Sequence, residues 1–188
     1  MLPDFIAYLN LARKVEGKDF IVEEKSLDIQ LVENMYPEVK DFIKPRGEQQ
    51  DLIDFITKTH NGCYLMTLSV GLGKSISSIF ICQKLKQRMV CIMRPGYHGE
   101  QTEDSISGWI KEFAKSTKVE PHEICTVSGN KELKSIINLA LNNELRYKVI
   151  LISNKTLQFY FKYYEQYSEE EFKDMGFNAT PMELGKIL

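Results

Sequence analysis

Apolar residues along this chain form short continuous runs that alternate with longer stretches of helical spacing. The short runs predict strands over 63–68, 88–93, 124–127 and 148–152, and the helical spacing predicts helices over 50–59, 75–87, 109–114, 131–143 and 157–167. Strands and helices that alternate in this way are typical of a parallel sheet with helices on its faces. The pattern therefore predicts an α/β fold in which ligands bind beyond the carboxyl ends of the strands.

The first 43 residues show a different pattern. A helix is predicted to begin at Pro3-Asp4 and to end near Gly17, a short strand covers 20–22, and a further segment follows Ser26 as its N-cap. A short amphipathic piece containing Val39, Phe42 and Ile43 completes this part. We expect residues 1–43 to be a small helical accessory element without identifiable chemistry, and residues 44–188 to form the main domain.

A glycine-rich turn separates the first predicted strand from the next helix. The turn is Gly71-Leu72-Gly73-Lys74-Ser75. Glycines allow backbone N–H groups to close around an anion, and the positive end of a helix dipole favours negative charge at the same place. A lysine here can reach the β- and γ-phosphates of a nucleotide, and a serine hydroxyl can bind Mg²⁺.

The full phosphate-loop signature is G-x-x-x-x-G-K-[ST], and its first glycine is replaced here by Leu68. The alternative is an ordinary glycine-rich turn before a helix that carries a surface lysine. The strand predicted before the turn and the helix predicted after it are the context that the signature requires, so we favour a site for nucleotide phosphates.

Composition narrows the class of protein. The chain is 43% hydrophobic and 27% charged, as folded domains are, and its net charge of −2 argues against non-specific nucleic-acid binding by the whole surface but allows a local basic groove. The four cysteines form no C-x-x-C pair, which argues against zinc and for free thiols in a reducing compartment. No apolar stretch reaches the length of a membrane span, so we expect a soluble intracellular or cytoplasmic protein without a membrane partner.

The order of motifs over residues 44–167 resembles the first RecA-like motor domain of superfamily 2 helicases and Swi2/Snf2-type translocases. The segment Arg46-Gly47-Glu48-Gln49 looks like the R-P-x-Q adenine-recognition element of that family. The segment from Val70 to Ser75 is similar to the M-G-L-G-K-T version of its motif I, which also lacks the first glycine.

Four later segments resemble further motifs of the family. These are Val90–Pro95, similar to the strand that begins motif Ia; Trp109–Phe113, similar to the N-W-x-x-E-F helix; Thr126–Gly129, similar to the next strand exit; and Val149–Leu157, similar to the segment that ends T-T-Y-E-T-L. Each is weak alone, and their order and spacing carry the resemblance.

The resemblance implies a parallel RecA-like sheet of the P-loop NTPase class and an ATP-dependent DNA helicase or translocase, with RNA as a possible track. Its cofactors would be ATP and Mg²⁺, with Lys74 and Ser75 as the catalytic residues and Ser75 as the Mg²⁺ ligand. The residues implied in nucleotide binding are Arg46, Gln49, Val70, Gly71, Leu72, Gly73, Lys74 and Ser75. Gln49 would contact the adenine edge, and Arg46 would support that loop.

The loops after the strands would face the nucleic-acid backbone, because basic side chains, hydroxyls and backbone N–H groups supply most phosphate contacts. The candidates are Arg94, Pro95, Lys155 and Thr156. The aromatic residues between 159 and 167 follow helical spacing, which favours core packing over stacking on bases.

The chain also departs from the family. The loop between Pro95 and Trp109 is long, and Asn154-Lys155 replaces the usual Tyr-Glu pair. No apolar strand that ends Asp-Glu-x-His follows residue 157, and the acidic residues nearby, 103–104 and 169–171, do not follow a predicted strand. We therefore expect this chain to be catalytically incomplete, ending before the Walker B strand, with the rest of the motor in the same or a second chain.

Two other functions stay open. A small P-loop phosphotransferase would need an acidic residue on a strand near the phosphates and a lid with arginines, and neither is apparent in the sequence. A non-catalytic module for nucleic-acid or protein binding would keep only a vestigial phosphate loop, and its first 43 residues would contact a partner.

Overall fold

The computed structural model describes residues 35–59, 64–66, 69, 71–94 and 106–188. The elements expected before residue 35 lie outside these ranges, so they are neither confirmed nor contradicted. The same holds for most of the long loop after residue 94.

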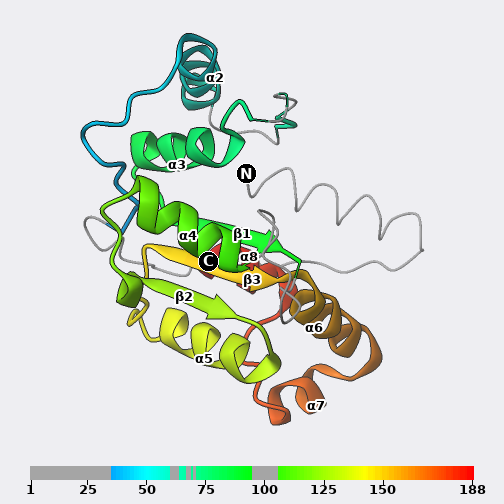
Figure 1. The fold of residues 1–188 in the computed structure, drawn as a ribbon. Coiled ribbons are helices and arrows are strands. Elements are labelled where there is room, and N and C mark those ends of the chain that lie inside the picture. The colour runs from blue at the N-terminus through cyan, green and yellow to red at the C-terminus, as the bar shows by residue number, and fades with distance from the viewer. Residues whose placement is uncertain (1–34, 60–63, 67–68, 70, 95–105) are drawn as a thin grey trace.

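A three-stranded parallel sheet lies at the centre of the described chain (Figure 1). Its strands are β1 (Met89–Met93), β2 (Ile124–Val127) and β3 (Val149–Ser153), in the order β1-β3-β2. Val149 pairs with Met89 on one side and with Ile124 on the other. The predicted strands over 88–93, 124–127 and 148–152 are confirmed, and so is the α/β arrangement of a parallel sheet flanked by helices.

Helices connect and cover these strands. They are α2 (Gly47–Lys58), α3 (Lys74–Leu85), α4 (Ile106–Ser116), α5 (Asn130–Leu141), α6 (Asn154–Gln166), α7 (Glu169–Asp174) and α8 (Pro181–Ile187), and a short 3-10 helix spans Pro121–Glu123. The five predicted helices are confirmed, and each begins slightly earlier than expected because the first turn of a helix precedes its first buried residue. Helices α7 and α8 were not predicted.

One expected strand differs. Of the strand predicted over 63–68, the described residues Tyr64–Met66 adopt no strand conformation, and the side chain of Leu65 is 89% exposed. The apolar run that predicted this strand is therefore not buried at Leu65. The spacing of apolar residues in a short run does not show whether the run is buried. Cys63, Thr67 and Leu68 lie outside the described residues.

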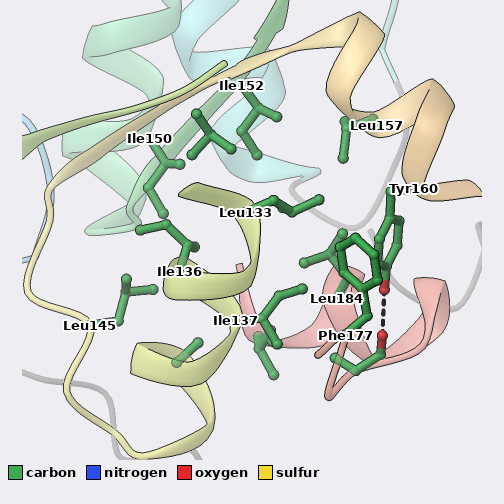
Figure 2. Close-up of a cluster of buried hydrophobic side chains, with 14 of the residues drawn as sticks. Leu133, Ile136, Ile137, Leu145, Ile150, Ile152, Leu157, Tyr160, Phe177 and Leu184 are labelled. Carbon is green, nitrogen blue, oxygen red and sulfur yellow. Dashed lines mark hydrogen bonds between the residues drawn. The ribbon is translucent and has the colours of Figure 1, made fainter. Parts of the chain in front are cut away.

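Two hydrophobic clusters lie on opposite faces of the sheet. Because successive side chains of a strand point to opposite faces, Ile150 and Ile152 belong to one cluster and Val149 and Leu151 to the other. The first cluster joins the sheet to α5, α6 and α8, as Figure 2 shows. The second joins it to α3 and α4, where Ile79 and Phe113 are fully buried.

The segment before α2 packs against the α/β body. Val39 forms an isolated antiparallel bridge with Thr117, and its N–H donates to Oε1 of Gln83 at 3.0 Å. Val39 is buried but Phe42 is 78% exposed, so the amphipathic piece expected here buries only part of its apolar set. The backbone pairing, rather than helical packing, holds this segment.

The acidic run after α6 begins a helix. The hydroxyl of Ser168 accepts from the N–H of Glu171, and the carboxylate of Glu171 accepts from the N–H of Ser168, which forms a capping box for α7. The residues from Glu169 to Glu171 form the first turn of α7 and are exposed. Thr180 and Glu183 cap α8 in the same way.

Candidate nucleotide and nucleic-acid sites

The candidate phosphate loop is the glycine-rich turn before α3, and it contains two glycines with left-handed backbone. Gly71 has φ of 82° and Gly73 has φ of 76°, a region that residues with a Cβ enter only at a cost in energy. Gly73 is the N-cap of α3, so the turn leads directly into the helix. In Figure 1, α3, α5 and α6 all begin on the side to which the strand arrows point, as expected for a parallel sheet with ligand sites at one edge.

The first turn of α3 leaves donors for an anion. The first helical bond runs from the N–H of Ser77 to the carbonyl of Gly73, and no side chain caps the preceding N–H groups. Lys74 is exposed, and its Nζ donates to the carbonyl of Ser69 at 3.3 Å, so the ammonium lies over the loop. Ser75 is half-buried in the same turn. Of the predicted set, Val70 lies outside the described residues.

Gln49 joins helix α2 to this loop. Its side chain is only 6% exposed; Nε2 donates to the carbonyl of Leu72 at 2.7 Å, and Oε1 accepts from the N–H of Arg46 at 2.8 Å. These bonds use one of two amide hydrogens and one of two carbonyl lone pairs. The structure therefore brings Gln49 to this loop, although it lies far from it in sequence, and Arg46 contacts Gln49 through its backbone N–H. Direct contact of Gln49 with adenine remains a prediction.

We expect Gln49→Glu to lower the free energy of unfolding by about 1–3 kcal/mol, because a carboxylate would face the Leu72 carbonyl without a donor. The substitution keeps the shape of the side chain and its acceptor for Arg46. Urea denaturation followed by circular dichroism measures the change. Gln158→Glu, at an exposed position on α6, is the control and should stay within about 0.5 kcal/mol of the wild type. Equal effects of the two changes would show that the Gln49 bridge contributes little.

A second candidate site is a pocket of about 380 Å³ where β2 and β3 end. Ser128, Gly129 and Asn130 line it from the start of α5, and Ser153, Lys155, Thr156, Phe159 and Tyr163 line it from the start of α6. Two helices of 12 and 13 residues thus begin beside one pocket. Neither helix has a side-chain hydrogen bond from its N-cap residue, and since the first turn of α6 holds no acidic residue, its first N–H groups are available to an anion.

The predicted nucleic-acid residues are only partly brought together. Lys155 and Thr156 both line this pocket. Arg94 is exposed and follows β1, whose Met93 pairs with Ser153, so it lies at the same sheet edge without lining the pocket. Pro95 lies outside the described residues.

The aromatic residues of α6 differ in their burial. Tyr160 is fully buried, and its ring lies 5.4 Å from that of Phe172 and 5.3 Å from that of Phe177, which confirms core packing there. Phe159 is 53% exposed and lines the pocket, so the expectation that it packs in the core with Tyr163 is wrong. The sequence could have indicated that Phe159 lies on the same helix face as Lys155 and Tyr163, because residues four apart share one face of a helix.

The described thiols are poor candidates for nucleophiles. Cys82, Cys91 and Cys125 are free, and burial raises the pKa of Cys82 to about 11 and raises that of Cys125. A thiol must ionise to attack or to bind metal, so these residues are protonated at neutral pH. No helix in the described ranges is long and apolar enough to cross a membrane.

No protein-family model, curated protein or solved structure matches the chain. The function is therefore inferred from the geometry of the two sites.

Proposed function

We propose that this chain is the ATP-binding portion of an ATP-dependent DNA helicase or translocase, with a RecA-like domain that binds Mg-ATP at the phosphate loop. The observation that carries the proposal is the joint geometry of Gly71, Gly73 and Gln49. Two left-handed glycines lead into the uncapped start of α3, and an amide from an upstream helix holds the loop. Backbone donors, a helix dipole and a lysine at one turn fit the phosphates of a nucleotide.

Hydrolysis needs two further groups, a carboxylate that holds the metal shell and a positive charge on the transferred phosphate. None of the three described strands is followed by Asp or Glu; the next residues are Arg94, Ser128 and Asn154. We therefore assign these groups to the rest of the motor, in the same or a second chain. In this arrangement Ser75 would hold Mg²⁺ and Lys74 the β- and γ-phosphates.

Lys74→Ala is expected to weaken Mg-ATP binding about tenfold or more, since a hydrogen bond to a charged group contributes about 1.5–3 kcal/mol. Isothermal titration calorimetry on the whole chain measures the affinity. Lys162→Ala removes the same charge at an exposed position on α6 and should leave binding unchanged. A folded wild type that binds no nucleotide would contradict the proposal.

A binding module without ATP hydrolysis is the second candidate. It is favoured by the pocket at the ends of β2 and β3, whose lining includes no residue of the phosphate loop. Nucleic-acid binding that weakens with salt but does not respond to ATP would support this function over a motor.

A further inference from the structure

We infer that the pocket at the ends of β2 and β3 binds single-stranded nucleic acid, with a phosphate at the start of α6 and an unstacked base against the ring of Phe159. The inference rests on the proposed nucleic-acid track and adds that this nucleic acid is single-stranded. The pocket volume, about 380 Å³, falls in the usual range for ligand sites, about 300–1,000 Å³.

The phosphate end is defined by the first turn of α6. No side chain caps this helix, no acidic residue lies in its first turn, and Lys155 adds a positive charge. Ser153 and Thr156 line the pocket, although the two residues are only 1% and 3% exposed. A hydroxyl at the wall of the pocket can donate to a phosphate oxygen, and a hydrogen bond to a charged acceptor is stronger than one between neutral groups.

The start of α5 is less suited to the phosphate. A carboxylate oxygen of Glu132 lies near Gly129, where an added Cβ would be only 2.9 Å from it. This carboxylate occupies the positive end of α5 and repels an anion in the same pocket. The phosphate is therefore assigned to α6, and Glu132 opposes its binding.

The base end is defined by Phe159. This ring is 53% exposed on the same helix face as Lys155, and among the described residues it contacts no other aromatic ring. The other aromatic residues of α6, namely Tyr160, Phe161, Tyr163, Tyr164 and Tyr167, each contact at least one ring. An exposed ring beside an anion site is the arrangement with which proteins bind unpaired bases, by stacking on a base next to a held phosphate.

The exposed ring of Phe159 indicates whether the nucleic acid is single-stranded or a duplex. Bases of a duplex are stacked on one another, and their faces cannot reach a side chain unless they leave the stack at a cost in energy. A single strand presents a face at every base. Stacking on Phe159 therefore favours a single strand over a duplex.

The test measures fluorescence anisotropy of labelled DNA with the whole 188-residue chain at one fixed salt concentration. Three probes of equal length are compared: oligo-dT, a strand of abasic sites and a duplex. Phe159→Ala removes the ring and Phe159→Tyr keeps it. Phe161→Ala is the matched control, because Phe161 is 38% exposed on the same helix and does not line the pocket.

Phe159→Ala should weaken oligo-dT binding about fivefold or more, the lower limit for loss of one stacked base, and leave the abasic strand nearly unaffected. Phe159→Tyr and Phe161→Ala should bind like the wild type, and Glu132→Gln should tighten binding of both single strands. Unchanged oligo-dT binding by Phe159→Ala, or a duplex bound as tightly as oligo-dT, would overturn the inference but leave the proposed track standing. A wild type that binds ATP in calorimetry but none of the three probes would overturn the inference and the nucleic-acid part of the proposed function.

Discussion

Tyr160→Ala is expected to lower the free energy of unfolding by about 3–5 kcal/mol, as deletion of a large buried ring does. Tyr160 is fully buried on α6 and packs against both Phe172, in α7, and Phe177, after it, whose two rings stack on each other. Its hydroxyl donates to the carbonyl of Ala179 at 2.5 Å, the dashed line in Figure 2. Removal of this side chain leaves a cavity and an unpartnered carbonyl where the C-terminal helices meet the sheet.

Urea denaturation, followed by circular dichroism, measures this effect as a shift of the midpoint. Tyr160→Phe keeps the ring and removes only the hydroxyl, so we expect a smaller loss of about 1–3 kcal/mol from the unpaired Ala179 carbonyl. Phe159→Ala, one residue earlier on the exposed face, is the control, with a change below about 1 kcal/mol. If Tyr160→Ala unfolded at the wild-type midpoint, the packing of α7 and α8 on this ring would contribute little to stability.

Gly73→Ala is expected to destabilise the chain and to weaken Mg-ATP binding by about tenfold or more, since each 1.4 kcal/mol is a factor of ten in affinity. The backbone at Gly73 is left-handed, which costs about 1–2 kcal/mol for a residue with a Cβ. The new Cβ would also lie 2.6 Å from Nε2 of Gln49 and 2.9 Å from Cγ2 of Ile76. Gln49 would have to give up its bond to the Leu72 carbonyl, and the loop would lose its support.

The chain supplies matched controls for this change. Gly71→Ala meets the same kind of left-handed backbone, with φ of 82°, but no atom within 4 Å of the added Cβ, so it measures backbone strain alone. Gly47→Ala, in open space at the start of α2, should be neutral or slightly stabilising. Urea denaturation and calorimetry give the two readouts. Equal losses for Gly71→Ala and Gly73→Ala would contradict the role given to the contact with Gln49.

The combination of Gly73→Ala with Gln49→Ala separates strain from contact. The double variant removes the nearest clashing atom, so its loss of stability should be smaller than the sum of the two single losses. Additive losses would show that Gly73 and Gln49 act independently.

The strands and helices were predictable from the sequence because their signals are local. The run Val149–Ile152 is continuously apolar and is buried on both faces in β3. The helical spacing over 131–143 predicted α5, in which Leu133, Ile136 and Ile137 are buried. Apolar spacing alone could not reveal that Tyr64–Met66 would adopt no strand conformation with Leu65 exposed, because burial depends on what packs against a segment.

The sequence by itself thus determined the parallel strands, their helices and the glycine turn before Lys74, since each depends on residues close in the chain. The tertiary structure alone decided the strand order β1-β3-β2, the contact of Gln49 with the phosphate loop and the exposure of Phe159. Phe159 and Tyr160 are neighbours with similar side chains, and only the packing of α7 and α8 on one face of α6 buries Tyr160 and leaves Phe159 at the pocket. Such long-range packing has no local signal, because it depends on which surfaces the folded chain brings together.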